Sequence, residues 1–140
     1  MKTGVEGSQK KYLIRWAPKC YRFKEEAFGN HAPQAPGIYV LVTHPGEPQA
    51  STLYVGLTLD TSIQEKLWQH WQGDHPGITA EIQRVPPVLY FCFVWQSDAQ
   101  SDQDLCDIAW FLVEQDKPLL NIQGVIKHSG RYSDIEVKEE

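Results

Sequence analysis

The sequence of 140 residues predicts one α/β domain, a small sandwich in which a three-stranded, mainly antiparallel sheet is flanked by helices. Residues 37–42 and 51–56 are two β-type runs separated by the turn-forming sequence HPGEP, which is typical of a hairpin. The hydrophobic period then changes from 2 to about 3.6 over residues 62–72, which predicts a helix across that hairpin. The continuous apolar run at residues 88–95 predicts a third strand, covered on both faces.

Composition supports a folded, globular chain. Apolar residues make up 41% of the sequence, and five Trp, five Phe and six Tyr supply large core side chains. No apolar run approaches the roughly 18 residues of a membrane span, and the first residues contain no apolar segment of a signal peptide. These features predict a cytoplasmic location without membrane contact. We expect residues 1–10 to be a flexible N-terminus, residues 11–126 to form the domain and residues 127–140 to be a charged tail.

The N-terminal half is predicted to contain a strand and two helices besides the hairpin. Residues 12–16 are expected to form a short strand or an apolar anchor. Residues 18–28 are predicted to be helical, with a proline in the first turn and Gly-Asn at the end. The helix over residues 62–72 is expected to be capped by Ser62 or Thr61.

The C-terminal half is predicted to alternate between helix and strand. A second helical candidate spans residues 78–84 and precedes the buried strand. The longest predicted helix covers residues 102–115, with acidic residues in its first turn, where the helix dipole favours them. Trp110 and Phe111 widen its apolar stripe, so this helix is expected to be deeply buried or to contact a partner.

Three cysteines, Cys20, Cys92 and Cys106, are widely spaced and odd in number. They form no CxxC motif, and none lies at metal-ligand spacing from a histidine. This arrangement predicts reduced structural thiols and no zinc site.

The net charge of −5 is unevenly distributed. Residues 1–24 carry seven basic side chains and one acidic one, a net of +6, whereas the rest of the chain has a net of −11. A protein that grips nucleic acid usually presents a basic face, and only this N-terminal segment supplies one. Arg22 and Lys24 are therefore candidate nucleic-acid contacts. The alternative is a solvated segment with no ligand.

Two tripeptides give the chain a resemblance to a known family. Residues 37–39 read Gly-Ile-Tyr and residues 54–56 read Tyr-Val-Gly, with 14 residues between the two tyrosines. Residues 118–121, Pro-Leu-Leu-Asn, follow the late helix. Over residues 36–122 the chain resembles the GIY-YIG nuclease superfamily.

The resemblance implies a set of candidate catalytic residues. In the family the first tyrosine helps to activate water and the second helps to hold the site together, which points to Tyr39 and Tyr54. The helical arginine position is Lys66, and the histidine that often follows is His70. The closing asparagine, Asn121, implies a role in ordering the end of the sheet. The implied cofactor is one divalent cation, Mg²⁺ or Mn²⁺, which acts as a Lewis acid on the phosphate.

The chain departs from the family pattern at two positions. The metal-binding glutamate of the late helix falls on Ala109, which cannot bind a metal. Its neighbours one helical turn away are Leu105, Cys106, Leu112 and Val113, none of them a carboxylate. Lys66 keeps the positive charge of the arginine but lacks its bidentate fork. No metal ligand is therefore assigned, and the resemblance implies a nuclease-like domain that does not cleave and instead binds DNA, RNA or a protein partner.

Other interpretations stay open at this point. Tyr39 and Tyr54 fit ordinary strand aromatics, Lys66 fits an exposed helix lysine, and His70 fits a surface position between two tryptophans. The domain as a whole fits an active, divalent-metal-dependent endonuclease with a rearranged site, or a protein-interaction module that includes a homodimer. The last alternative depends on a group of aromatic residues whose exposure the sequence does not show: Trp68, Trp71, Trp110 and Phe111.

Overall fold

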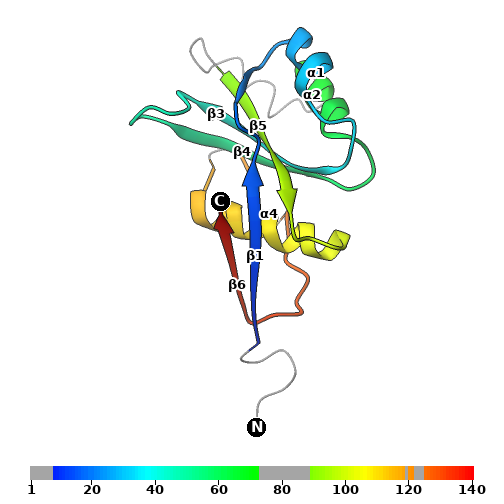
Figure 1. Ribbon diagram of the computed structural model, residues 1–140, viewed down its shortest axis with the longest axis vertical. Coiled ribbons are helices and arrows are strands. Elements are labelled where there is room, and N and C mark those ends of the chain that lie inside the picture. Colours follow the sequence, from blue (N-terminus) through cyan, green and yellow to red (C-terminus); the bar gives the residue numbers. More distant parts are fainter. Residues whose placement is uncertain (1–7, 73–88, 119, 122–124) are drawn as a thin grey trace.

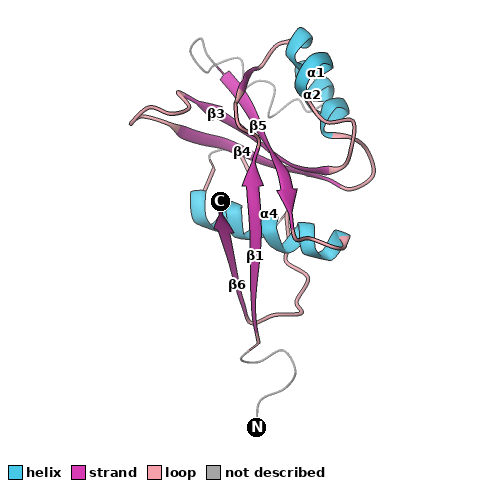
Figure 2. Cartoon of the chain, viewed as in Figure 1, coloured by secondary structure: helices cyan, strands magenta, loops and turns pink. Residues whose placement is uncertain are grey.

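A computed structural model describes residues 8–72, 89–118, 120–121 and 125–140. The helices and strands of the described part are shown in Figures 1 and 2. In chain order they are β1 (Gln9–Trp16), β2 (Tyr21–Arg22), α1 (Glu25–His31), β3 (Gly37–Thr43), β4 (Ser51–Thr58), α2 (Ile63–Gln72), β5 (Leu89–Ser97), α4 (Asp102–Asp116) and β6 (Asp134–Glu139). Within this part, no helix has the length and apolarity needed to cross a membrane. The helix predicted over residues 78–84 lies outside the described residues.

The α/β class is confirmed, but the sheet is larger than predicted. Within the described residues it has six strands: five in the order β4-β3-β5-β1-β6, and β2, which pairs with β5 at one side. The antiparallel β4-β3-β5 unit corresponds to the three predicted strands, and its register places Tyr39 opposite Gly56 and Phe93. The sheet is mixed because β1 and β6 pair in parallel.

Both ends of the described chain belong to this sheet. The predicted flexible N-terminus contributes Gln9 and Lys10 to β1, and the predicted charged tail contains β6. The tail prediction was wrong because frequent charges masked a two-residue alternation, in which Ile135 and Val137 are buried. The charged residues that alternate with them are exposed, and ion pairs such as Lys11–Glu136 and Arg15–Glu140 partly neutralise the basic N-terminal segment.

The helix predicted over residues 18–28 begins later than expected. Residues Tyr21–Arg22 form β2, and α1 starts only at Glu25. Tyr21 pairs with Phe91 of β5, so its ring packs against the sheet instead of continuing a helical stripe. The spacing of the apolar residues Tyr21 and Phe28 fits either one continuous helix or a strand followed by a shorter helix. The contact between Tyr21 and Phe91 favours the second arrangement.

Helices cover the sheet from opposite sides (Figure 1). Alternation along β3 sends Tyr39 and Leu41 into a cluster with α1 and α2, which we call the α2 face. Ile38 and Val40 point into a second cluster that contains the buried residues of α4, which we call the α4 face. The strand predicted at residues 88–95 is covered on both sides at its centre, as expected, because its side chains alternate between these two clusters.

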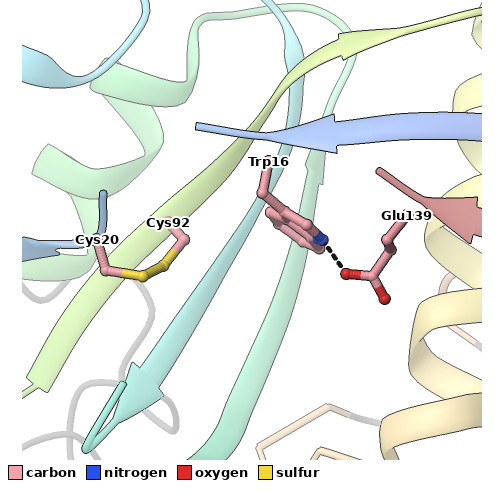
Figure 3. Close-up of a disulfide and its surroundings, with 4 residues drawn as sticks. All are labelled: Trp16, Cys20, Cys92 and Glu139. Carbon is pink, nitrogen blue, oxygen red and sulfur yellow. Dashed lines mark hydrogen bonds between the residues drawn. A yellow bond between two sulfur atoms is a disulfide. The ribbon is translucent and has the colours of Figure 1, made fainter. Parts of the chain in front are cut away.

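The prediction of three reduced thiols was wrong, because Cys20 and Cys92 form a disulfide (Figure 3). Cys20 directly precedes β2, and the pairing of Tyr21 with Phe91 continues to place Cys20 opposite Cys92. Their Cα atoms are 4.6 Å apart, within the usual range for a disulfide. The two residues are 72 positions apart in the sequence, so only the strand pairing reveals the bond. Cys106 is a free thiol.

Candidate functional site

Tyr39 lies directly across the backbone of Gly56. A Cβ atom built on Gly56 would come within 2.1 Å of Cζ of the Tyr39 ring, a distance that no real contact shows. The ring therefore occupies the space that a side chain would need, and the glycine of the Tyr-Val-Gly tripeptide is a steric requirement of the first tyrosine. This contact links the two motifs physically.

The Tyr39 hydroxyl is hydrogen-bonded to His70. Its oxygen lies 2.7 Å from His70 Nε2, and both side chains are only 1% exposed. Helix α2 presents His70 to the sheet, and this helix starts where Ser62 accepts a hydrogen bond from the Glu65 backbone, as the predicted cap requires. The Tyr54 ring completes the cluster, with its centroid 6.1 Å from that of Tyr39 and 5.4 Å from that of His70. We call these three residues the tyrosine–histidine cluster.

Burial controls the acid–base chemistry of this cluster. Loss of water, followed by the neighbouring Tyr54 hydroxyl, holds the pKa of Tyr39 well above its ordinary value. Burial also raises the pKa of Tyr54, although its hydrogen bond with Tyr39 acts in the opposite direction. Both phenols are thus protonated at neutral pH and unsuited to act as bases. The Tyr39 hydroxyl is also closed off from a ligand the size of a phosphate diester.

Asn121 lies at the outer edge of the sheet. Its side-chain oxygen accepts a hydrogen bond from the Val55 backbone at 2.8 Å, and its amide nitrogen donates to the Val55 carbonyl at 2.9 Å. Because β4 is an edge strand, this amide pairs with backbone groups of Val55 that would otherwise lack a partner strand. Asn121 thus holds the Tyr-Val-Gly segment in place, and it also lines a cleft of about 190 Å³ with Glu114 and Lys117.

The basic candidates are not gathered around the cluster. Lys66 lies on α2 one turn before His70, is partly exposed and forms no ion pair with another described residue. Arg22 pairs with Tyr90 and, by strand alternation with Tyr21, points toward the opposite side of the sheet from the α2 face. Lys24 is exposed at the start of α1. Of these three, only Lys66 shares an element with the tyrosine–histidine cluster.

Ala109 occupies a place that does not suit a metal ligand. It is 0% exposed and packs in the α4-face cluster with Val40 and Val55, on the opposite side of the sheet from Tyr39. The tyrosine–histidine cluster contains two neutral phenols and an imidazole. The side-chain amide of Asn121 is already hydrogen-bonded to the backbone of Val55. Among the described residues, no group of three or more His, Cys, Asp or Glu side chains is placed to hold a metal ion. The side chains present therefore do not fit the divalent cation that the family resemblance implies.

The α4 face contains a second polar cluster that sequence reasoning missed. Asp107 is 0% exposed and accepts hydrogen bonds from the Tyr12 hydroxyl at 3.0 Å, the Ser129 backbone at 2.6 Å and Arg131 at 3.0 Å. Asp104 accepts further bonds from Tyr12 and Arg131, each at 2.8 Å. We call these five residues the aspartate network. An aspartate in the first turns of a helix is usually read as a dipole partner, and nothing in the local sequence marks contacts this distant.

The aspartate network shifts the pKa of several of its members. Burial alone would raise the pKa of Asp104, but hydrogen bonds from the Gln100 backbone, Arg131 and Tyr12 lower it to about 2. Burial and the two carboxylates raise the pKa of Tyr12. The network ties the segment before β6 to α4 and β1.

Comparison of the chain with protein-family models, with curated proteins and with solved structures gives no match. The likeness to GIY-YIG nucleases therefore depends on the motif residues of this chain.

Proposed function

We propose that this chain is a GIY-YIG-like domain that does not cleave phosphodiester bonds and that binds nucleic acid weakly through the surface of α2. The observation that carries the proposal is the buried hydrogen bond between Tyr39 and His70. A tyrosine that activates water has to reach it, and this hydroxyl is occupied and enclosed. The Gly-Ile-Tyr and Tyr-Val-Gly motifs pack against each other through Tyr39 and Gly56. This packing requires the same residues whether or not the domain cleaves.

Two further features support the loss of cleavage. Position 109 holds a buried alanine on the opposite side of the sheet from Tyr39, so it supplies no carboxylate to the tyrosine–histidine cluster. Lys66 supplies a point charge in place of the planar fork that grips a phosphate in two places. The negative charge that develops on the phosphate in the transition state would thus lack both the metal-binding carboxylate and the arginine that stabilise it in the family.

A cleavage assay tests the first half of the proposal. The wild type and Tyr39→Phe are incubated with supercoiled plasmid, single-stranded DNA, branched DNA and RNA, each with Mg²⁺ and with Mn²⁺. We expect no cleavage by either protein. Cleavage by the wild type that Tyr39→Phe abolishes would establish the alternative, an active endonuclease with a rearranged site.

Binding through α2 needs a separate measurement. Lys66 is the cation beside the cluster, and the net charge of −5 predicts few phosphate contacts. We expect fluorescence anisotropy with a labelled duplex at low salt to show weak binding, with a salt slope of roughly one to three. Lys66→Ala should lower that slope by about one. Lys138→Ala removes an exposed lysine on β6 and serves as the matched control. Equal effects of the two variants, or no binding at low salt, would contradict this half of the proposal.

A second candidate function is protein interaction, favoured by a groove that contains an exposed tryptophan. Trp95 is 57% exposed and lines a groove of about 520 Å³ together with Leu13, Arg15 and Glu140. Of the aromatic residues suspected from sequence, only Trp71 belongs to the exposed large hydrophobic residues of the described part, and it packs against Phe28. Sedimentation at rising concentration tests this function, and self-association lost in Trp95→Gln would support it.

A further inference from the structure

A small cleft beside the aspartate network has the chemistry of a cation site. It lies between α4 and the segment that leads into β6, and its volume is about 100 Å³. Sites that enclose a drug-sized ligand measure about 300–1,000 Å³, so this cleft admits only the tip of a ligand. The residues that line it are Trp110, His128, Tyr132, Ser133, Asp134 and Ile135.

Aromatic rings form much of its wall. The rings of Trp110 and His128 meet edge to face, with centroids 4.9 Å apart. Nδ1 of His128 accepts a hydrogen bond from the Gly130 backbone at 3.0 Å, which fixes the orientation of this ring. Tyr132 already meets one cation, because the Arg131 guanidinium lies 5.1 Å from its ring centroid. Electron-rich ring faces attract organic cations in the same way.

The charges around the cleft favour a positive ligand. Arg131 is paired with Asp104 and Asp107 at 2.8 and 3.0 Å, so its charge is already compensated. Asp134, which lines the cleft, forms no ion pair with another described residue. The aspartate network and the cleft together thus contain three carboxylates and one guanidinium, so the excess charge is negative.

The cleft is held in shape before any ligand arrives. At one end, the backbone and hydroxyl of Ser129 donate to Asp107 at 2.6 and 3.0 Å. At the other end, the backbones of Ser133 and Asp134 both donate to the Ser8 carbonyl at 3.1 Å. A wall fixed in this way loses little conformational entropy when it binds a ligand.

We propose that this cleft binds an organic ammonium group, with the rings of Trp110 and Tyr132 against its alkyl surface and the Asp134 carboxylate facing its charge. The group is either the head of a free small cation or the methylated side chain of a lysine in another protein. The site is separate from the tyrosine–histidine cluster, so its test does not depend on the proposed function.

The experiment compares three probes of similar shape by isothermal titration calorimetry on the full chain. Choline represents a free cation, acetyl-trimethyl-lysine amide represents a protein side chain, and 3,3-dimethylbutan-1-ol is the uncharged counterpart of choline. We expect saturable binding of at least one cation and none of the alcohol. Choline alone would indicate a free metabolite, and stronger binding of the lysine derivative would indicate a protein partner. Equal binding of the alcohol, or no saturable binding of either cation, would overturn the proposal.

Variants locate the binding. Asp134→Asn should weaken cation binding about tenfold, because it removes the charge and keeps the shape. Asp60→Asn makes the same change of net charge at an exposed position elsewhere and should have no effect. Trp110→Leu should weaken binding about fivefold through loss of the ring face. If Asp60→Asn and Asp134→Asn had the same effect, the binding would be non-specific and the proposal wrong.

Discussion

The two faces of the sheet each bury a tyrosine hydroxyl with polar partners, but they assemble these partners differently. On the α2 face, the Tyr39 hydroxyl bonds to the His70 imidazole, 31 positions away. On the α4 face, Tyr12 meets Asp107, 95 positions away, in a charged network that includes Arg131. The first cluster looks catalytic in sequence, yet it is enclosed and its two phenols are protonated. The second has no sequence signature, yet it ties the end of the chain to the core.

This contrast matters because the predicted catalytic positions fall on both faces. Tyr39, Tyr54 and His70 share the α2-face side, whereas Ala109 belongs to the α4 face. Restoring a glutamate at position 109 would therefore place it in the wrong environment. The strongest test of the comparison is to make that change.

Ala109→Glu is expected to cause the largest loss of stability, about 4 kcal/mol or more. The substitution adds a long carboxylate to a fully buried position among aliphatic side chains, where it would be neither paired nor accommodated. Urea unfolding followed by circular dichroism measures the effect. Gln115→Glu, at an exposed position of the same helix, should change stability by less than about 0.5 kcal/mol. A folded Ala109→Glu protein that binds Mn²⁺ would mean that position 109 reaches the site after all.

Asp107→Asn is expected to cost about 3–4 kcal/mol. It removes a buried charge that pairs with Arg131, and it directs an amide donor at the donating backbone of Ser129. On the other face, Tyr39→Phe removes the hydroxyl that bonds to His70 and Tyr54 but no charged carboxylate, and it should cost only about 1–2 kcal/mol. The same urea unfolding curves give both values. Equal losses of unfolding free energy in the two variants would contradict the prediction that the charged aspartate network stabilises the fold more than the tyrosine–histidine cluster does.

Gly56→Ala is expected to cost about 2–3 kcal/mol, because its Cβ would overlap the Tyr39 ring and force it to move. Gly29→Ala is the matched control. It lies in α1, where an added Cβ meets nothing within 4 Å, so it should stabilise the protein by up to about 1 kcal/mol. In combination with Tyr39→Leu, the cost of Gly56→Ala should fall. An undiminished cost in that double variant would show that the clash with Tyr39 is not the cause.

Local patterns in the sequence predicted the parts of the fold that depend on neighbours along the chain. The hairpin, α2 with its Ser62 cap, the buried strand and α4 are confirmed because period, turn residues and caps act over a few positions. The tyrosine–histidine cluster could be anticipated for the same reason. Its members lie within one hairpin and the helix that follows.

The rest depends on pairing between distant segments. The Cys20–Cys92 disulfide joins positions 72 residues apart, the Tyr12–Asp107 bond of the aspartate network joins positions 95 apart, and the parallel pairing of β1 with β6 brings together positions 125 apart. The charges of β6 suggested a tail because their ion-pair partners lie on β1, at the other end of the sequence. The burial of Tyr39 and His70 was also beyond the sequence, since a motif does not show whether its side chains are open to solvent.

A last prediction concerns the response to acid, and it tests the α4 face alone. The pKa of Asp104 falls from 3.8 to about 2 in the folded protein, so the folded state favours the charged carboxylate. The stability that this carboxylate contributes is fully present above about pH 4, and it is lost as the pH falls toward 2. Urea unfolding between pH 2 and 5 should show this decline in the wild type. Asp104→Asn should flatten the acid limb, because the group that takes up the proton is gone. The exposed Asp60→Asn, which has no ion pair in the described part, should leave the curve unchanged. If Asp104→Asn kept the full loss of stability below about pH 4, protonation of other groups would cause that loss. The aspartate network would then not be the source of the acid sensitivity.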